Sequence, residues 1–534
     1  MQVQNNMNRN ILLITTDQQR YDSLGCNGGN IARTPTIDSL ASTGISYTKC
    51  FGQNATCTPA RSTIITGMHP HTHGAWALGV PLADDTPNVA RLLSEHGYNT
   101  GLVGKGHFQP TADRNGRFSE GRVAASNPGP LLGFDRAVLC GHGPFGQHYG
   151  QWINKNYPEF TGGFVDMVNR QNHPTRAFGG DTFASEVAIN PIPRELYHTD
   201  WVANSAMDMI AGWPDDQPWF LWLSFPDPHH PWDPPSDERY RVPWKELPLP
   251  DFYPGSPAAS MKMLESRPPH WLGYWNGTWK TETSRSDWAP HQMTPDQVCE
   301  INALVHIKNE LIDEACGRVI TAINDRNDAG ETEVLFTTDH GEFQGEFGLL
   351  YKGPFHTSAL LHLPMIWRPA PNRAISPAVV SDVVGQIDIA PTICETAGID
   401  VPDWMQGQTL PKTSGTRIDS LALTSYDSPN PGLGMHLRTI TTETHICTVY
   451  EPSTIGEPTG LERFDDLTWG AMPPSTVSYT GSEGELYNIV DDPTEQINLW
   501  SDSGQRKIRD ELIGRMRDEA PPKRMPWPLA EAGY

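Results

Sequence analysis

Residues 10–17 read NILLITTD, and residues 333–341 read EVLFTTDHG. Both stretches contain an apolar run with β-branched residues that leads into an aspartate. A short continuous apolar run is typical of a strand that is buried on both faces of a sheet. Residues 219–225 (WFLWLSF) have the same character and residues 98–103 form a further strand candidate, and these two lead into PDPHHP and GKGH. The sequence therefore predicts several buried strands, each followed directly by polar residues.

Helical patterns lie between these runs. Short helices are expected at residues 36–42 and 86–97, with another strand at 45–51. The clearest helix begins at Thr294–Pro295 and continues to about Asn324, with apolar residues on one face. This alternation predicts an α/β fold: a large mixed, mostly parallel sheet sandwiched by helices. Open α/β sheets bind ligands at the carboxyl ends of their strands, where the polar residues of this chain gather.

The pattern changes after about residue 410. Four short strand candidates follow, at residues 421–426, 437–442, 445–450 and 485–489. A charged helix is expected near residues 505–518, which together predicts a smaller antiparallel unit. We therefore divide the chain into a catalytic α/β domain (1–410) and a C-terminal α+β subdomain (411–534). Residues 226–292 are rich in Pro and Trp with little periodicity, and are expected to form a long insertion near the site.

Acidic residues outnumber basic ones in this chain of 534 residues: 63 Asp and Glu against 39 Lys and Arg give a net charge of −24. A nucleic acid or an anionic membrane requires a cationic face, so we expect neither as a partner. The 37% hydrophobic content is that of a globular chain with a large core. An anionic substrate would therefore need a locally basic pocket within an acidic protein.

The first ten residues, MQVQNNMNRN, are polar, and the apolar run after them is too short for a signal sequence or a membrane span. The eight cysteines form no CxxC pair. These features predict a cytoplasmic protein with reduced thiols.

Residues 57–61 read CTPAR. Pro59 suits the first turn of a helix, and Gly67 suits its end. Cys57 is therefore expected at a helix N-terminus, where free N–H groups and the helix dipole favour negative charge. Arg61, one turn along, would face the same way. These residues alone are also consistent with a buried thiol beside a capping turn.

Six segments, in this order, resemble those of the sulfatases of the alkaline phosphatase superfamily: ILLITTDQQR, CTPAR with the following ITG, TGLVGKGHF, FPDPHHPW, TTDHGEFQGEFGLLYKGPFH and ELYNIVDDPTEQINL. They extend over most of the chain, and their fixed order is far more specific than any one segment. The resemblance implies an alkaline phosphatase-like fold and the formylglycine-dependent hydrolysis of sulfate esters. Close relatives with the same nucleophile motif are phosphonate monoester hydrolases.

For Cys57 the resemblance implies oxidation to formylglycine by a formylglycine-generating enzyme. The aldehyde is hydrated to a gem-diol, and one hydroxyl attacks sulfur to form a covalent sulfate ester. The second hydroxyl then loses its proton and expels sulfate as the aldehyde forms again. This is nucleophilic catalysis with a built-in release route, which a simple alcohol or thiol would lack.

The resemblance also implies one divalent metal ion, with ligands from Asp17, Gln18, Cys57, Asp339 and His340. Such an ion makes the attacking oxygen a better nucleophile and polarises the sulfuryl oxygens. Carboxylate and amide oxygens suit Ca²⁺, Mg²⁺ or Mn²⁺, and the imidazole favours Mn²⁺. Many relatives have a second acid in place of Gln18, so this chain lacks one negative charge, which weighs against Ca²⁺. We expect Mn²⁺ or Ca²⁺, with Mg²⁺ as a third candidate.

Four cationic or imidazole side chains are expected around the sulfate. Lys105 and His107 match the family's G-K-x-H segment, Lys352 matches its Y-K-G segment, and Arg61 belongs to the nucleophile motif. Fixed positive groups in a dry pocket stabilise the charge that develops on the sulfate oxygens.

Proton transfers are assigned by the same resemblance. His107 is the candidate base during release, and His229 is the candidate donor at the leaving-group oxygen, alone or with Lys352. Asp339 could accept the proton of the attacking hydroxyl. His230 is the alternative to His229, because only the spacing to the two flanking prolines separates them.

Other candidates have a structural reading. His69, His71 and His73 are spaced by two, as in some metal sites, but relatives show a similar turn, which favours a supporting role. Trp76 and Trp232 could form an apolar wall for an aryl group or belong to the core.

The sequence thus predicts a sulfatase for small aryl or alkyl sulfates. The alternative is a phosphonate monoester hydrolase or phosphodiesterase with the same machinery, since these substrates also carry one negative charge. Phosphonate hydrolases commonly show an asparagine in the segment that reads HGAWALGVPL here, where Leu78 makes the wall apolar. The related hydrolases also suggest a homo-oligomer.

Overall fold

The largest sheet of the molecule has eight strands in the order β12-β2-β11-β9-β1-β8-β4-β5. The computed structural model describes residues 9–110, 117–125, 128–144, 146–160, 178–281, 288–428, 435–452 and 477–525. The strands of this sheet are β1 (Asn10–Asp17), β2 (Ile45–Tyr47), β4 (Asn99–Gly104), β5 (Arg136–Leu139), β8 (Trp219–Pro228), β9 (Thr332–Thr338), β11 (Met365–Arg368) and β12 (Ala378–Val380). The five strands β9, β1, β8, β4 and β5 are parallel, whereas β11 is antiparallel to both neighbours. The predicted mostly parallel sheet is confirmed.

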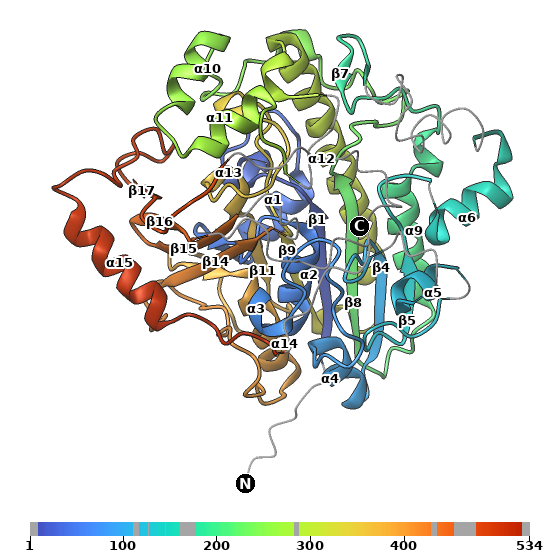
Figure 1. The fold of residues 1–534 in the computed structure, drawn as a ribbon. Coiled ribbons are helices and arrows are strands. Elements are labelled where there is room, and N and C mark those ends of the chain that lie inside the picture. The colour runs from blue at the N-terminus through green and yellow to red at the C-terminus, as the bar shows by residue number, and fades with distance from the viewer. Residues whose placement is uncertain are drawn as a thin grey trace.

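Helices cover both faces of the sheet, because successive residues of each central strand point to opposite sides. Leu12 and Ile14 of β1 pack in one core with α1 (Pro35–Thr43), α9 (His198–Ala211) and α12 (Pro295–Asn324). Ile11 and Leu13 pack in the other core with α2 (Cys57–Thr66), α4 (Val89–Glu95) and α14 (Ile389–Ala397). Figure 1 shows the sheet at the centre of the molecule between these helices. The predicted sandwich is therefore present.

The shorter elements surround this core. Further helices among the described residues are α3 (Pro70–His73), α5 (Ser119–Ala125), α6 (Gln147–Asn156), α10 (Pro257–Leu264), α11 (Pro269–Asn276) and α13 (Ser358–Leu361). The strand expected at 45–51 is divided, because β3 (Cys50–Phe51) leaves the large sheet and pairs with β10 (His362–Leu363) and β13 (Val384–Gly385). A short β6 (Phe178–Gly179) pairs with β7 (Ala184–Ser185). The insertion 226–292 contains α10 and α11, which its low periodicity did not predict; both begin at a proline.

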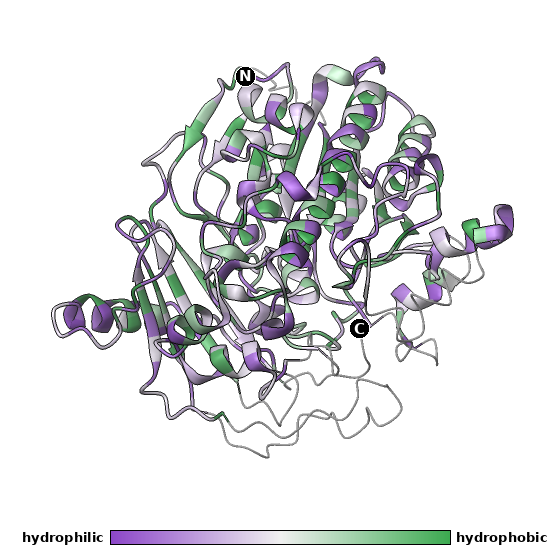
Figure 2. Ribbon diagram, turned by 90° about the horizontal axis from the view of Figure 1, so that it is seen from above, coloured by the Kyte–Doolittle hydropathy of each residue, from purple (hydrophilic) through white to green (hydrophobic). Residues whose placement is uncertain are grey.

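The C-terminal part forms a four-stranded antiparallel sheet of β14 (Leu421–Asp427), β15 (His436–Thr442), β16 (His445–Tyr450) and β17 (Gly484–Asn488). Helix α15 (Arg506–Asp518) packs on it through Leu512, Ile513 and Met516. Figure 2 shows both hydrophilic and hydrophobic segments on α15 at the rim of the molecule, as expected for a helix with one buried face. The predicted α+β unit is confirmed, while the boundary at residue 410 stays a prediction.

Two further expectations concern the environment of the protein. All eight cysteines lie within the described residues and are free thiols. In the described part of the chain, no helix combines the length and the apolar character that a membrane span requires. The cytoplasmic location stays a prediction.

Candidate active site

Five neighbouring parallel strands bring polar side chains to one edge of the sheet. Asp339 and His340 follow β9, Asp17 ends β1 and Gln18 follows it, His229 follows β8, Lys105 and His107 follow β4, and His142 follows β5. This edge holds the carboxyl ends of the strands, where open α/β sheets bind their ligands. The sheet order alone therefore gathers residues that are up to 323 positions apart, from Asp17 to His340.

Cys57 is the first residue of α2, as the sequence predicts. Thr56 before it is extended, and α2 ends at Gly67 in the left-handed region with a φ of 66°. The Cys57 Sγ atom lies 3.1 Å from Lys352 Nζ and 3.2 Å from His340 Nε2. The side chain is 2% exposed, so this thiol faces the interior of the site rather than solvent.

Four predicted metal ligands, this thiol among them, converge at one point. Ligand atoms of Asp17, Cys57, Asp339 and His340 all lie within 4.8 Å of one another, and all four residues are buried. His340 Nδ1 lies 3.0 Å from the carbonyl oxygen of Gly341 and donates to it, which leaves the lone pair on Nε2, the nitrogen that faces the cluster. The donor set of two carboxylates, one imidazole and the Cys57 side chain therefore fits a divalent cation.

Gln18 adds a fifth potential ligand. Its backbone has a φ of 64°, and its backbone N–H donates to Asp339 Oδ1 over 3.0 Å. Its side-chain N–H donates to Glu342, which turns the Oε1 atom toward Lys352 Nζ at 2.9 Å. Gln18 Oε1, Cys57 Sγ and His340 Nε2 thus all face the Lys352 ammonium, so these donors already surround one positive charge.

Arg61 is fully buried and organises the acidic side of the site. Its Nε donates to Asp339 Oδ2 over 2.9 Å, and its Nη2 lies 3.5 Å from Asp17 Oδ2. Its Nη1 donates to the backbone oxygen of Lys105 and to Ser224 Oγ. The sequence predicts Arg61 among the groups around the sulfate, whereas the hydrogen bonds of its side chain go to carboxylates and strand ends.

The loop after β4 places Lys105 and His107. Gly104 has a φ of 105°, and a Cβ atom there would lie 1.8 Å from the carbonyl oxygen of Ser224, so only glycine fits. Glu120 accepts hydrogen bonds from three successive backbone N–H groups of this loop, those of residues 107, 108 and 109. Lys105 forms an ion pair with Asp17. The loop is therefore held from both ends.

Both histidines of the PDPHHP segment lie at the site. The His229 ring stacks on that of His230 at 3.9 Å and on that of His142 at 3.8 Å. His230 Nδ1 lies 3.4 Å from Gln18 Nε2. The structure therefore brings together His229 and its alternative, and does not separate their roles.

The family model for sulfatases matches residues 9–399. The chain belongs to the sulfatase family. An arylsulfatase of Clostridium perfringens is 26% identical over 437 residues, covering 76% of this chain and 78% of that protein. PehA of Trinickia caryophylli, a multifunctional alkaline phosphatase superfamily protein, is 24% identical over 415 residues, covering 75% and 76%. The crystal structure of a phosphonate monoester hydrolase of Agrobacterium radiobacter has a TM-score of 0.72 at 20% identity, with 96% of this chain and 95% of that chain covered.

These findings place the sulfatase among the sulfuric ester hydrolases and confirm the alkaline phosphatase-like fold. At 20% identity, the similarity to the phosphonate monoester hydrolase structure supports the fold alone. Members of this family generally use a divalent metal ion and a formylglycine, and the buried Asp, Cys, Asp and His cluster is consistent with both.

Opposing charges set the ionisation of the sulfatase site. Burial alone would raise the pKa of Asp17, but Lys105 and Arg61 hold it well below its usual value. Burial and Asp17 oppose ionisation of Cys57, yet Lys105 and Lys352 lower the pKa of this thiol well below its usual range. Burial would lower the pKa of Lys352, but Cys57 and Asp17 raise it. The site therefore holds the ionised carboxylate of Asp17 beside the protonated amine of Lys352.

The imidazoles on the other side of the site are neutral. Burial first, and then the charge of Lys105, lowers the pKa of His107. Burial first, and then His142, lowers the pKa of His229 well below its usual value. A neutral His107 can accept a proton, as a base must.

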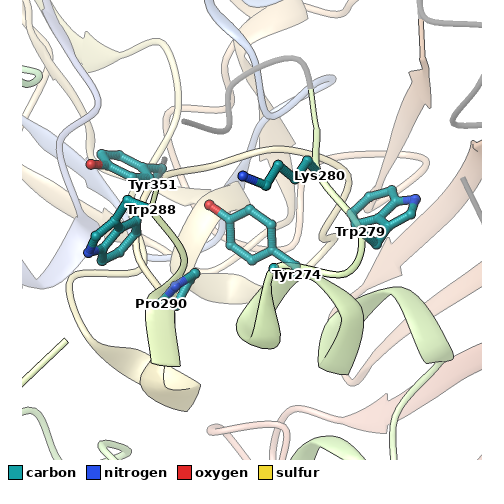
Figure 3. A pocket seen from close by; sticks show the side chains of 7 residues that line it. Tyr274, Trp279, Lys280, Trp288, Pro290 and Tyr351 are labelled. Atoms are coloured by element: carbon teal, nitrogen blue, oxygen red, sulfur yellow. The ribbon is translucent and has the colours of Figure 1, made fainter. Parts of the chain in front are cut away.

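A small aromatic pocket adjoins Lys352. It is lined by Tyr274, Gly277, Trp279, Lys280, Trp288, Pro290 and Tyr351, and contains about 220 Å³ of space, counting its open side. Figure 3 shows the Lys280 side chain reaching over Tyr274 toward Tyr351 and Trp288. The Tyr351 ring also lies 4.9 Å from that of His230, so Tyr351 links the pocket to the PDPHHP loop.

The sequence analysis misses three residues that support the site: His142, Glu120 and Lys308. His142 follows β5, a four-residue strand of mixed polarity that gives no strand signal. Lys308 of α12 donates to the carbonyl oxygens of His229 and Pro231, which fixes the PDPHHP loop from beneath. A glycine on each side of His142 is the one local sign that could have singled it out.

Proposed function

We propose that this sulfatase hydrolyses sulfate esters of small aryl or alkyl alcohols, using a formylglycine formed from Cys57 and one divalent metal ion. The observation that carries the proposal is the buried convergence of Asp17, Cys57, Asp339 and His340 within 4.8 Å at the start of a helix. Lysines 105 and 352 add positive charge at the same point, which suits an anionic ester.

Asp17, Gln18, Asp339 and His340 would hold the metal ion together with the modified Cys57. When bound, the ion supplies Lewis-acid chemistry to the nucleophilic hydroxyl and to the sulfuryl oxygens. The mixed oxygen and nitrogen donor set supports Mn²⁺ ahead of Ca²⁺ and Mg²⁺. Arg61 keeps the two carboxylates in place through its contacts with Asp17 and Asp339.

The basic side chains are proposed to divide sulfate binding and proton transfer among them. Lys105 and Lys352 would bind the sulfate oxygens, and their charge offsets the charge that develops there. His107, neutral in the site, would take the proton of the second hydroxyl during release. Lys352 carries a proton in the site and is therefore proposed as a proton donor to the leaving-group oxygen. His229, whose pKa burial lowers well below its usual value, would act beside it only after taking up a proton.

An aromatic or other apolar leaving group is supported by the walls of the site. Tyr351 links the histidines of the PDPHHP loop to the pocket of Figure 3, whose sides are mostly aromatic. Aromatic side chains favour flat, apolar partners. This observation favours aryl esters within the proposed class.

The test compares kcat/KM for p-nitrophenyl sulfate and p-nitrophenyl phenylphosphonate, with protein matured by a formylglycine-generating enzyme and supplied with Mn²⁺. We expect the sulfate to be the better substrate. A large excess for the phosphonate would instead establish the phosphonate monoester hydrolase alternative, to which the fold is also similar. Failure with both esters would overturn both proposals.

We further propose a homo-oligomer that matures and acts in the cytoplasm, with the formylglycine-generating enzyme as its transient partner. Light scattering of the purified protein would measure the mass of the assembly. Fractionation of the native host would locate the enzyme.

A further inference from the structure

We propose that His142 is a positioning residue of this active site, which sets the place of both Lys105 and His229. The inference rests on the proposed function, because it assigns Lys105 to the sulfate and His229 to the leaving group. His142 lies in the loop after β5, the strand next to β4 at the catalytic edge of the sheet.

The first contact joins His142 to Lys105. The Lys105 ammonium lies 2.9 Å from His142 Nε2 and also contacts Asp17. An ammonium has only donors, so His142 Nε2 must accept this hydrogen bond and the ring must be neutral. The imidazole therefore holds the amine of Lys105 in a fixed direction.

The second contact joins His142 to His229. The two rings are stacked with centroids 3.8 Å apart and planes inclined by 20°. His230 stacks on the opposite side at 3.9 Å, so His229 lies between two imidazoles. A ring held on both faces keeps its orientation about the Cβ–Cγ bond. His142 is one of the two outer members of the stack, and its side chain is 22% exposed, whereas His229 is buried.

A comparison with a structural histidine supports an active role. Both ring nitrogens of His270 have partners, the Tyr479 hydroxyl and the Pro354 carbonyl oxygen. With Nε2 of His142 accepting from Lys105, the proton lies on Nδ1, and this atom is buried without a hydrogen-bond partner among the described residues. His142 thus stacks on His229 and also has an N–H group, at Nδ1, that donates to no described residue.

Two substitutions separate the two contacts. His142→Phe keeps a flat ring against His229 but removes the acceptor for Lys105. His142→Gln keeps an acceptor but removes the stacked ring. Each variant is assayed for kcat and KM with a series of aryl sulfates whose phenols range from good to poor leaving groups, and for inhibition by inorganic sulfate.

For His142→Phe we expect weaker sulfate binding, seen as a rise of about tenfold in KM and in the inhibition constant of sulfate, with an unchanged dependence on the leaving group. For His142→Gln we expect the reverse: sulfate inhibition stays near that of the wild type. Esters of poor leaving groups then lose about tenfold to a hundredfold more kcat than p-nitrophenyl sulfate, because a misplaced donor matters most when the leaving group needs a proton.

His148→Gln is the matched control. His148 Nδ1 accepts a hydrogen bond from the backbone N–H of Leu139 at the end of β5, so this change disturbs the same loop without touching the site. It should alter thermal stability at most. If both His142 variants act alike, or like the His148 control, the positioning role is wrong. Turnover of p-nitrophenyl sulfate by the wild type tests the proposed function separately, since that result does not depend on His142.

Discussion

Two buried clusters of carboxylate, imidazole and cation differ in how their atoms are used. In the cluster around Cys57, ligand atoms of four residues point at one another within 4.8 Å. In the second cluster, Asp427 at the end of β14 accepts from His71 Nε2 at 2.6 Å, from His436 Nδ1 at 2.5 Å and from Arg438 Nη2 at 2.8 Å. Each carboxylate oxygen of Asp427 already has a partner.

This difference separates a site from a structural network. The MHPHTHG segment has the spacing of a metal site, but His71 is bonded to Asp427, and His73 is bonded to Thr63 Oγ1 and to the backbone N–H of Ala75. These histidines therefore join the segment after α2 to its neighbours, in line with the supporting role that the sequence favours. Four ligand atoms that converge on one point, as around Cys57, are the better sign of a metal site than a carboxylate whose oxygens face three separate donors.

The largest effect should come from the nucleophile. Cys57→Ala should lower kcat on the order of 10⁴-fold or more while leaving the melting temperature nearly unchanged, because this small side chain contributes little to the core. Cys57→Ser should also fail in multiple turnover, since its ester has no second hydroxyl from which to expel sulfate. Intact-protein mass spectrometry should find sulfate bound to the serine variant. Steady turnover by that variant would contradict the release route.

Maturation provides the matching test on the wild type. Peptide mass spectrometry should show the segment with Cys57 carrying an aldehyde, and the converted fraction should follow specific activity across expression hosts. Fully active protein with only unmodified Cys57 would rule out the formylglycine.

The next effect concerns the metal ion. His340→Asn replaces an imidazole by an amide oxygen, so preference should shift from Mn²⁺ toward Ca²⁺. The loss of Mn²⁺ affinity should exceed the roughly 10- to 100-fold effect of an outer-shell partner, as measured by metal titration. Equal loss of activity with every metal, at unchanged Mn²⁺ affinity, would count against a ligand role.

A substitution in the second cluster should change stability and leave chemistry alone. Asp427→Asn leaves Arg438 and His71 with a weaker acceptor and should cost about 3 kcal/mol of unfolding free energy. Partner charges outweigh burial and hold the pKa of Asp427 well below its usual value, so its contribution is present above about pH 4 and is lost as pH falls through the lower folded pKa. Differential scanning calorimetry at pH 7 measures the effect. A changed Mn²⁺ stoichiometry would show that the two clusters are not separate.

Glu495 should give the smallest effect, with the opposite dependence on pH. Its Oε1 accepts from the N–H and hydroxyl of Ser358, but its Oε2 has no partner among the described residues. Burial raises the pKa of Glu495 to about 7. The folded state therefore binds the extra proton, and stability falls as pH rises from about 4.5 through 7.

Glu495→Gln removes that titration. At pH 8 the unfolding free energy of the variant should exceed that of the wild type by an amount on the order of 1–3 kcal/mol, seen as a higher melting temperature. This gain should shrink toward pH 5. Ser358→Ala serves as a control, because it removes a donor to Glu495 without removing the charge. A gain that does not vary with pH would contradict the raised pKa.

The local signals of the sequence were sufficient for the elements that carry most of the site. Pro59 and Gly67 define the two ends of α2, so the position of Cys57 at a helix start follows from residues within ten positions of it. Asp17 and Asp339 come at the ends of apolar runs, and such runs predict buried strands. The order of sequence segments was specific enough to indicate the family.

Other features depend on the partners that the fold supplies. The sequence could not show that Arg61 would turn to Asp17 and Asp339, or that His71 would meet Asp427, because these contacts join segments up to 356 positions apart. It also gave no signal for β5, and therefore none for His142, since a four-residue strand takes its stability from pairing with β4.

The sequence by itself determined which residues could do chemistry, because apolar runs, a proline and a glycine dictate local structure within a few residues. Only the tertiary structure decided which of them meet. The parallel order β9-β1-β8-β4-β5 aligns the carboxyl ends of the strands and brings their polar residues to one edge. His71 lies elsewhere and is hydrogen-bonded to Asp427. The physical reason is that an imidazole or a carboxylate has the same chemistry in any sequence, and its neighbours decide whether its lone pairs are used by the fold or left for a ligand.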